Sequence, residues 1–298
     1  MKVFLTGSTG GIGGWVYKEL QQHGIEVAAL IRPSSSGSLN LSGPVIHGDL
    51  TDLAAIESEF ARFQPDVVIH LAWLGVDQKE KSNPGQIHNL QALAELLRLS
   101  QKYKVRSFIG MGSESEYGVH NKKIDENTPT LPRSHYALCK LAAGLLAQKM
   151  CQDAQIHFTW LRLFSSYGPN DRPGSLMSLL IKTLLAGKPM NLSGCEQVWD
   201  YIYVQDIARL IAEIAVTPRE PGFYNLGGGQ ATVLKNIVLK IAALINPQAE
   251  LHFGAIPYSP GQLMHLEADI SKLLRVYSWR PQVRLEDGLK EAIRFHQR

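Results

Sequence analysis

Cysteine is scarce in this sequence, and the cysteines that are present form no motif. The 298 residues include Cys139, Cys151 and Cys195, an odd number with no C-x-x-C pair. This spacing is not that of a disulfide framework or a zinc knuckle, so we expect no metal site. A reducing cytoplasm is the expected setting.

Long apolar runs and runs of like charge are also missing. No stretch approaches the roughly 20 apolar residues needed to cross a bilayer, and the first residues lack the apolar core of a signal peptide, so we expect no membrane partner. The net charge is only +3, with no basic stripe interleaved with aromatic residues. This balance argues against a nucleic-acid partner. With 45% hydrophobic residues, the chain can bury a full core.

Glycine, by contrast, is concentrated near the start of the chain. The apolar residues 3–6 run into a glycine-rich turn at 7–14, and a helical pattern follows at 15–20. In such a strand–turn–helix unit, Gly7 allows the turn, Gly10 lets backbone N–H groups approach a pyrophosphate, and Gly13 lets the helix pack closely on the strand. A plain βα turn is the alternative, because the spacing differs from Gly-x-Gly-x-x-Gly.

Short apolar runs alternate with helical periodicity along the first half of the chain. The runs are continuous, as is typical of a parallel sheet covered by helices on both faces. The expected strands are residues 26–31, 44–47, 66–71, 105–111 and 156–163, and the expected helices are residues 52–63, 83–103 and 134–152. We therefore predict an α/β fold with a Rossmann-type, doubly wound parallel sheet.

The pattern changes after about Gly168, where proline and glycine clusters begin. A helix is expected near 175–186, whereas segments near 199–215 and 223–226 still resemble sheet and helix of the first layer. We predict a dinucleotide-binding domain of residues 1–166 plus about 198–226. Residues 167–197 and 227–298 then form a smaller, discontinuous C-terminal substrate lobe.

Tyr136 and Lys140 stand four residues apart in a predicted helix and so project from one face. A phenol has a pKa near 10, and a neighbouring ammonium lowers it by favouring the phenolate. The pair can therefore act as an acid and base, with Ser113 at the end of the preceding strand as a hydrogen-bonding group. A solvated surface pair is the alternative interpretation.

Together with other motifs, these residues give the chain a resemblance to the extended short-chain dehydrogenase/reductases, NAD(P)-dependent nucleotide-sugar epimerases, dehydratases and reductases. The resemblance covers nearly the whole length. It rests on Thr6-Gly7-x-x-Gly10-x-x-Gly13, Gly48-Asp49-Leu50-Thr51-Asp52, His70-Leu71-Ala72, Asn89, Ser113 four residues before Tyr117-Gly118, Tyr136-x-x-x-Lys140, Leu161-Arg162-x-Phe164, and Asp200-Tyr201-Ile202-Tyr203-Val204-x-Asp206.

The resemblance implies roles for individual residues. Tyr136 would exchange a proton with the substrate oxygen, Ser113 would hydrogen-bond the same oxygen, and Lys140 would hold the nicotinamide ribose and tune Tyr136. Asp49 and Leu50 would flank the adenine. The implied cofactor-binding residues are Gly7, Thr9, Gly10, Gly11, Ile12, Gly13, Asp49, Leu50, Leu71, Ala72, Trp73, Asn89, Tyr136, Lys140 and Phe164.

The end of the second strand bears on the choice of cofactor. Relatives that prefer NAD usually carry an acidic residue there to hold the ribose 2′-hydroxyl, but this strand runs into Arg32-Pro33-Ser34. Arg32 and Ser34 could instead hold a 2′-phosphate by charge-assisted hydrogen bonds. We therefore expect NADP(H), with NAD as the alternative and an exposed arginine without a cofactor role as the simpler interpretation.

Residues 113–118 bear on the choice of reaction. Nucleotide-sugar 4,6-dehydratases of the family need a glutamate two residues before the tyrosine equivalent to Tyr117, and 3,5-epimerase/reductases typically use a cysteine there. This chain has Ser115. Dehydration is therefore not expected. Glu114 is a candidate for the substrate site, whereas a solvated or backbone-capping carboxylate is the simpler interpretation of both Glu114 and Glu116.

The substrate lobe departs from the family pattern. Relatives often have arginines that grip the diphosphate where this chain has Trp199 and Ser259, and asparagine where it has Ser165. Trp199 could stack on a base or sugar, or pack within the lobe. Ser165 and Trp199 are thus candidate substrate residues beside Ser113 and Glu114.

Three functions are consistent with these residues. The first is an NADP(H)-dependent reductase of the keto group, at C4, of a nucleotide-linked 6-deoxyhexose. The second is a nucleotide-sugar 4-epimerase, and the third is a catalytically silent relative. The substrate partner would be a nucleotide-diphosphate sugar.

A homodimer is also expected. The helices at 83–103 and 134–152 carry more apolar residues than one sheet-facing stripe needs, among them Leu93, Leu96, Leu97, Leu141, Leu145 and Leu146. Relatives pair these helices in a four-helix bundle across a two-fold axis.

Overall fold

Two compact units make up the protein, and the computed structural model describes residues 1–33, 41–172 and 174–297 of it. The first unit consists of Met1–Gly118, Pro129–Leu163 and Ile207–Tyr224. The second consists of Val119–Thr128, Phe164–Asp206 and Asn225–Arg298.

A seven-stranded sheet forms the centre of the first unit. Its strand order is β11 (Gly222–Leu226), β7 (His157–Leu163), β5 (Ser107–Ser113), β4 (Val67–His70), β1 (Lys2–Thr6), β2 (Glu26–Ile31) and β3 (Val45–His47). The pairs from β7 to β3 are parallel. The order reverses between β1 and β4, which is where doubly wound folds bind ligands at the carboxyl edge. The predicted fold class is confirmed.

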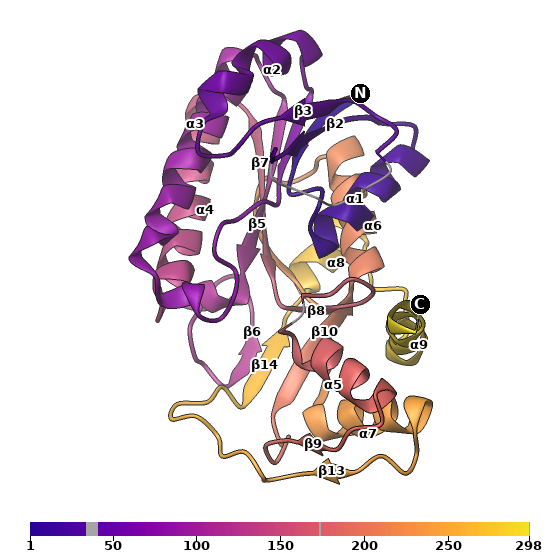
Figure 1. Cartoon of the computed structure of the whole chain (residues 1–298). Coiled ribbons are helices and arrows are strands. Elements are labelled where there is room, and N and C mark those ends of the chain that lie inside the picture. Colours follow the sequence, from indigo (N-terminus) through magenta and orange to yellow (C-terminus); the bar gives the residue numbers. More distant parts are fainter. Residues whose placement is uncertain (34–40, 173, 298) are drawn as a thin grey trace. The chain divides into compact units, whose positions relative to one another are not determined.

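Helices cover both faces of this sheet. Figure 1 shows α2 (Glu57–Phe63), α3 (His88–Lys102) and α4 (His135–Asp153) on one face, with α1 (Gly11–Gln22) and α6 (Val204–Val216) on the other. Two expected helices begin as 3-10 turns, η1 (Leu53–Ile56) before α2 and η3 (Pro84–Ile87) before α3. Asp52 and Asn83 cap these turns by accepting backbone N–H groups.

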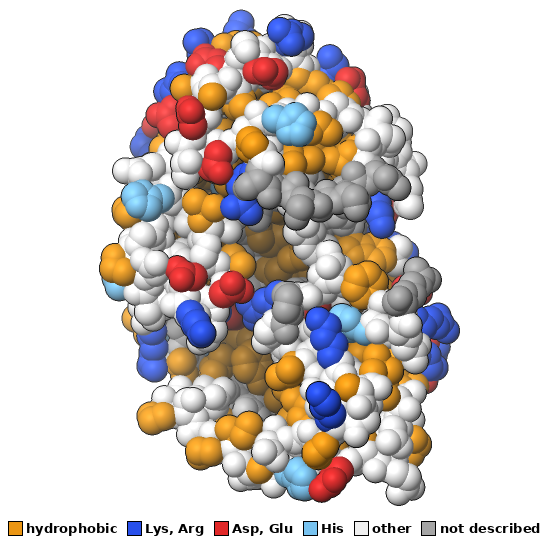
Figure 2. All heavy atoms as spheres, viewed as in Figure 1, with side chains coloured by type: hydrophobic (Ala, Val, Ile, Leu, Met, Phe, Trp, Pro, Cys, Tyr) orange, Lys and Arg blue, Asp and Glu red, His pale blue; other side chains and the backbone are white. Residues whose placement is uncertain are grey.

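Apolar strand residues pack beneath α2 and α3. Phe4, Phe60 and Phe108 are fully buried there, and the rings of Phe4 and Phe60 meet edge-on at 4.9 Å. Outside this core, Figure 2 shows acidic and basic side chains interspersed over α2 and α3. Glu57 pairs there with Lys102 at 2.6 Å and Arg98 at 3.7 Å. The amphipathic character of these helices thus fixes which faces they bury.

The second unit has its own sheet. Strands β12 (Ala231–Val233), β10 (Val198–Tyr203), β14 (His265–Ala268) and β6 (Lys122–Ile124) lie in that order, and β8 (Ser165–Tyr167) also pairs with β10. β9 (Met190–Asn191) and β13 (Leu251–His252) form a separate parallel pair. Helices α5 (Leu176–Leu185), α7 (Leu234–Ile245) and α9 (Leu285–His296) pack on one another, and α8 (Ser271–Tyr277) follows β14.

Asp200 ties this second sheet together. Its carboxylate is fully buried and accepts backbone N–H groups from Gly228 at 2.7 Å, Gly229 at 3.0 Å and Ala268 at 3.0 Å. These three hydrogen bonds replace the hydration that the carboxylate loses on burial. One side chain therefore joins β10 to two segments that lie far along the chain.

The observed units differ from the expected domain boundaries at β10. The expectation grouped 198–226 with the first domain, but β10 pairs only with strands of the second unit among the described residues. Residues 119–128 also join the second unit, because β6 pairs with β14. α6 from Ile207 onward and most of β11 lie in the first unit. The backbone pairing of each strand, rather than its apolar character, decides its sheet.

The cysteines and the apolar character of the helices can now be described in the structure. Cys139, Cys151 and Cys195 are free and buried. Among the described helices, none has the length and apolarity required to cross a membrane.

Candidate functional site

The glycine turn between β1 and α1 brings three backbone segments into close contact. Gly7 has φ +81°, and a Cβ on it would lie 2.7 Å from the Ala72 nitrogen. A Cβ on Gly13 would lie 2.0 Å from the Gly7 carbonyl oxygen. The Thr6 hydroxyl accepts the Ala72 N–H at 3.3 Å, so the segment after β4 lies against the turn. Any side chain at Gly7 or Gly13 would force these segments apart.

The N-terminus of α1 fits a pyrophosphate. Gly10 is its N-cap, no described side chain caps it, and its first turn carries no acidic residue. Thr9, Gly11 and Ile12 are partly exposed around it. Uncapped N–H groups and the positive end of the helix dipole attract anions. The cradle around Gly7, which a Cβ would fill, is consistent with a dinucleotide cofactor.

His70 ends β4 beside this turn. Its Nδ1 lies 2.9 Å from the Thr6 hydroxyl oxygen. Burial, with a smaller contribution from the charge of Lys140, lowers the pKa of His70 to about 3. His70 is therefore a neutral, structural member of this edge rather than a general acid.

Ser113 ends β5 and starts the short 3-10 turn η4 (Glu114–Glu116). Its hydroxyl donates to the Glu114 carboxylate and accepts the Ser115 N–H at 3.2 Å. The Glu116 carboxylate accepts the Ser113 N–H at 2.9 Å, which completes a capping box. Glu114 thus contacts the predicted catalytic hydroxyl, and Glu116 is a buried capping carboxylate.

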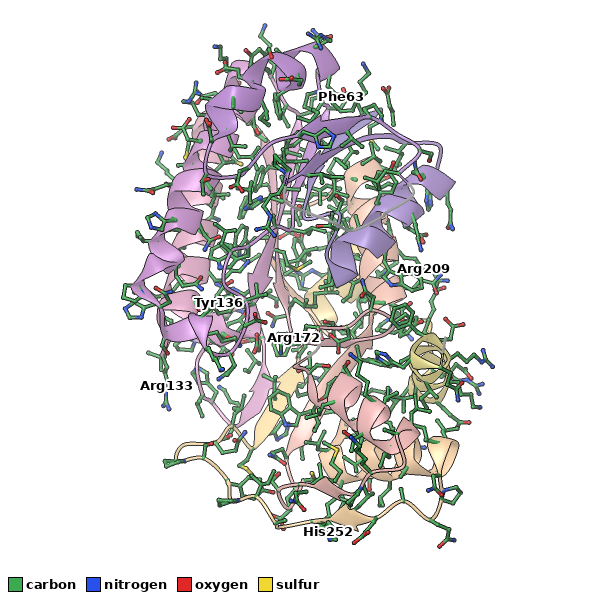
Figure 3. The ribbon with its side chains drawn as sticks, in the orientation of Figure 1. Phe63, Arg133, Tyr136, Arg172, Arg209 and His252 are labelled. Carbon is green, nitrogen blue, oxygen red and sulfur yellow. The ribbon has the colours of Figure 1, made fainter. Side chains whose placement is uncertain are left out.

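Tyr136 lies in the first turn of α4 (Figure 3), where Ser134 caps the helix by accepting the Ala137 N–H at 3.1 Å. The ring of Trp73 meets the Tyr136 ring edge-on at 6.1 Å. Two ammonium groups face that ring, Lys81 at 5.2 Å and Lys140 at 5.9 Å from its centroid. Lys81 belongs to the turn η2 (Glu80–Ser82), and the sequence alone gave no signal for it. Cations at this distance favour the phenolate form.

Lys140 is buried beneath Tyr136, with 3% of its surface exposed. Its ammonium donates to the Met111 carbonyl oxygen at 2.7 Å and lies 3.7 Å from the Trp73 ring centroid. Burial lowers the pKa of Lys140 to about 7, and the charge of Glu116 opposes that shift. Lys140 can therefore gain or lose a proton near neutral pH.

The segment between β4 and α3 is held by two buried amides. Gln86 accepts the Trp73 indole N–H at 2.7 Å and donates to the Gly75 carbonyl at 2.6 Å. Asn89 accepts the Leu74 N–H at 2.8 Å and donates to its carbonyl at 3.1 Å. Asn89 therefore positions this segment, and a direct cofactor contact for it stays a prediction. Gln86 is a positioning residue that sequence reasoning missed.

Residues predicted near the adenine lie at the ends of β2 and β3. Asp49 accepts the backbone N–H and the hydroxyl of Thr51 at 2.9 and 2.8 Å, which keeps the pKa of Asp49 below its usual value, with a smaller contribution from the charge of Arg32. Arg32 is exposed, Leu50 is buried in the core, and Ser34 lies outside the described residues. The Arg32 charge is thus available to a ligand.

The remaining candidates lie in the second unit. Phe164 is buried, and its N–H donates to the Leu226 carbonyl at 2.9 Å. Ser165 is half-buried in β8. Trp199 lies in β10 and packs against the apolar cluster of α5, α7 and α9, which agrees with the packing interpretation of this residue. Leu71 and Ala72 remain with Trp73 in the first unit.

Within the described part of the chain, no cluster of three or more His, Cys, Asp or Glu side chains could hold a metal ion. The structure brings two ammonium groups, of Lys81 and Lys140, to the Tyr136 phenol, and joins the Ser113 hydroxyl to the Glu114 carboxylate. Such a set can hold or move a proton at an oxygen atom of a bound molecule.

Comparison with known proteins gives consistent matches over the full length. Residues 3–227 match the model of the NAD dependent epimerase/dehydratase family. A Bacillus subtilis protein described as an uncharacterized UDP-glucose epimerase is 30% identical, over 99% of this chain and 98% of the relative. The dTDP-glucose 4,6-dehydratase of Salmonella typhimurium is 24% identical, over 99% of this chain and 92% of that protein. The structure of Thermus thermophilus UDP-glucose 4-epimerase in complex with NAD is 25% identical, with a TM-score of 0.89, over 100% of this chain and 99% of that one.

The burial of Lys140 predicts a pH dependence of stability. The unfolded chain holds this proton up to about the ordinary lysine pKa of 10.5, whereas the folded protein releases it near pH 7. Raising the pH from about 7 to about 10 therefore favours the folded state through Lys140. The free energy of unfolding should therefore rise between these pH values by on the order of 3 kcal/mol through Lys140, and this rise should be absent in Lys140→Met. Urea denaturation at both pH values measures the difference.

Lys149→Met is the matched control, because Lys149 is an exposed lysine on the same helix. It should retain the parental difference between the two pH values. An undiminished difference in Lys140→Met would contradict the assignment of a lowered pKa to Lys140.

Proposed function

Because the chain belongs to the NAD dependent epimerase/dehydratase family, we propose that it inverts the configuration at C4 of a nucleotide-linked hexose, with NAD as its cofactor. The relatives described as UDP-glucose epimerases favour a uridine diphosphate sugar. This reaction replaces the reductase as the leading candidate, because the relatives support epimerisation better than a net reduction.

The placement of Tyr136 over a buried ammonium carries this proposal. The Lys140 ammonium lies 5.9 Å from the Tyr136 ring centroid and the Lys81 ammonium 5.2 Å from it, so the phenol is surrounded by positive charge. A neighbouring cation favours the phenolate form of a phenol. Tyr136 is therefore suited to take a proton from a sugar hydroxyl and return it.

Each residue then has a defined task. NAD held at the glycine turn would supply reversible hydride transfer at C4 of the sugar. Tyr136 removes the proton of the C4 hydroxyl and later gives it back, and Ser113 donates a hydrogen bond to the same oxygen. Gly7, Gly10 and Gly13 leave room for the pyrophosphate at the N-terminus of α1.

A net reductase is the second candidate, favoured by Arg32 and by the missing carboxylate at the end of β2. It would consume NADPH with a 4-keto-6-deoxy nucleotide sugar, whereas the epimerase would interconvert sugars without net cofactor turnover. Dehydration is not proposed, because Ser115 stands where dehydratases carry a glutamate and a hydroxyl is a poor base.

The catalytic proposal predicts a large effect of a small change. The parent should interconvert UDP-glucose and UDP-galactose, followed by proton NMR of the anomeric signals. Tyr136→Phe should lower kcat by about 100-fold or more, since it removes a positioned acid and base while keeping the ring. Binding of NAD, followed by fluorescence, should persist.

Tyr103→Phe serves as the control, because the Tyr103 hydroxyl only donates to Glu57 at the surface of α2. It should retain parental turnover. Parental turnover in Tyr136→Phe would refute the assigned chemistry, and Glu114 would become the first alternative acid.

The NADP(H) candidate is tested at Arg32. Arg32→Ala should weaken NADPH binding at least about tenfold and leave NADH binding almost unchanged, because only NADPH carries the 2′-phosphate. Titration of both cofactors by fluorescence measures this, with the exposed Arg62→Ala as the control for a lost surface charge. Equal losses for the two cofactors would remove the basis for a 2′-phosphate contact.

We also propose a homodimer through α4. Leu138, Leu145 and Leu146 are 54%, 51% and 36% exposed on α4, whereas Leu93, Leu96 and Leu97 of α3 are buried in their own core. The α3 leucines therefore contribute to the core rather than to a free surface.

Sedimentation velocity at micromolar concentration should show a dimer for the parent and a monomer for Leu145→Glu, since a charge in an apolar interface is unfavourable. Leu179→Glu changes a leucine of equal exposure on α5 and should leave the dimer intact. A monomeric parent would rule the dimer out.

A further inference from the structure

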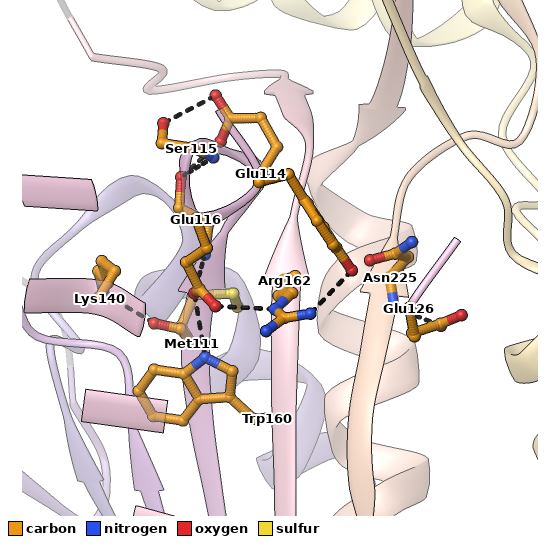
Figure 4. A network of polar contacts seen from close by, with 11 residues as sticks. Met111, Glu114, Ser115, Glu116, Glu126, Lys140, Trp160, Arg162 and Asn225 are labelled. Atoms are coloured by element: carbon orange, nitrogen blue, oxygen red, sulfur yellow. Dashed lines mark hydrogen bonds and ion pairs between the residues drawn. The ribbon is translucent and has the colours of Figure 1, made fainter. Parts of the chain in front are cut away.

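A fully buried carboxylate lies one turn beyond Ser113. Glu116 has none of its surface exposed, yet three donors from three places reach it (Figure 4). These are the Ser113 backbone N–H at 2.9 Å, the Trp160 indole N–H at 3.1 Å and the Arg162 Nε–H at 2.7 Å. Such a set of donors satisfies the buried carboxylate oxygens and fixes their orientation. The mechanism proposed above assigns it no task.

Glycines surround the Trp160 ring and the Glu116 carboxylate, because larger residues would not fit there. A Cβ on Gly112 would lie 2.3 Å from the Trp160 indole nitrogen and 2.5 Å from the Glu116 Oε1. Cβ atoms on Gly110 and Gly144 would also meet the Trp160 ring, at 2.3 and 2.9 Å. Glycines on β5 and α4 therefore allow the indole to reach Glu116.

Arg162 balances the charge of Glu116. It is 5% exposed, donates to the Tyr117 hydroxyl at 2.9 Å, and its guanidinium carbon lies 4.6 Å from the ring centroids of both Tyr117 and Phe223. A buried ion pair contributes little net stability, because the loss of hydration offsets the attraction. Apolar residues could fill the same volume, so stability alone does not explain the pair.

Glu116 has two connections to the candidate site. Its carboxylate fixes the backbone of Ser113 through the capping box, and α4, which carries Lys140, packs directly on η4. The Glu116 charge raises the pKa of Lys140, against the larger effect of burial. The same side chain therefore acts on the hydroxyl donor and on the buried ammonium.

We propose that Glu116 is a positioning residue of this site, which holds the Ser113 backbone in place and sets its carboxylate beside the Met111–Gly112 peptide, whose carbonyl accepts a hydrogen bond from the Lys140 ammonium. Arg162 and Trp160 hold the Glu116 carboxylate in this orientation through their hydrogen bonds to it. The inference concerns the proton-transfer site and rests on the proposed function for its catalytic meaning, whereas the effect on Lys140 is independent of the substrate.

The elements packed against α4 carry other titratable and charged groups. They are Glu80 and Lys81 on η2, Glu114 on η4, His157 and Arg162 on β7, and the exposed His88, Glu95, Arg98 and Lys102 on α3. His70 lies on β4, the strand next to β5. Tyr136 lies on α4 itself. Of the acidic groups, Glu116 is the fully buried one.

The test is a direct titration of Lys140 in the cofactor-free protein. With [ε-13C]lysine, the Lys140 signal is identified by its loss in Lys140→Arg, and its chemical shift is followed with pH by NMR. Glu116→Gln keeps the shape of the side chain and removes its charge, so the titration midpoint of Lys140 should fall by about one pH unit or more. In turnover assays, the alkaline loss of activity should begin at lower pH.

Trp160→Phe is the matched control. It removes one hydrogen bond to Glu116 and leaves the carboxylate charge in place, so the Lys140 midpoint should stay near the parental value even if the melting temperature falls. An unchanged midpoint in Glu116→Gln, or an equal fall in Trp160→Phe, would overturn the proposal, because the role would then be purely structural.

Loss of the Glu116 charge leaves Arg162 buried and unpaired, so Glu116→Gln could fail to fold. The double variant Glu116→Gln/Arg162→Met removes both charges and restores neutrality. A smaller fall in the Lys140 midpoint is expected from it, because the lost Arg162 charge offsets part of the lost Glu116 charge. An unchanged midpoint in the folded double variant also overturns the proposal. A protein that shows the fall but does not act on nucleotide sugars would refute the proposed function and leave the Glu116–Lys140 coupling standing.

Discussion

The close approach of three backbone segments at the carboxyl edge of the first sheet is the constraint on which the rest of the site depends. The Gly7 and Gly13 positions leave no space for a Cβ, and the Thr6 hydroxyl holds Ala72 against the turn. This contact sets the start of α1 and the path of the chain after β4, which carries Trp73. Trp73 in turn covers the ammonium of Lys140. The glycine turn and the buried Lys140 are thus parts of one packing arrangement.

Burial of charge is the second common theme. Lys140, Glu116 and Arg162 are each at most 6% exposed as side chains or whole residues, in a region that apolar residues could fill. A buried ammonium is poorly hydrated and therefore changes its protonation readily, which is useful at a reacting oxygen and unfavourable for stability. The Glu116 carboxylate, held by Trp160 and Arg162, opposes part of the effect of burial on the pKa of Lys140. The contacts of Lys140, Glu116 and Arg162 therefore affect both the stability of the fold and the pKa of Lys140.

Much of the fold could be predicted because its signals are local. The apolar runs at 26–31 and 156–163 became strands within one residue, and the four-residue spacing placed Tyr136 and Lys140 on one face of α4. Signals that depend on distant partners were missed. β10 has the same apolar pattern in either sheet, Glu116 is buried by Arg162 from a later strand, and an apolar stripe does not say whether Leu93 faces the core or a second copy.

The second unit is built from three separate segments of the chain, and this has a consequence for its synthesis. β6 is made early, but its partner β14 comes near the end of the chain, and the Asp200 carboxylate must wait for Gly228, Gly229 and Ala268. Closing such long loops costs entropy before any contact repays it. On the ribosome, β6 therefore emerges as an unpaired strand and stays so until residues 265–268 leave the exit tunnel. During this interval β6 lacks its partner strand, and an unpaired strand invites pairing with other chains.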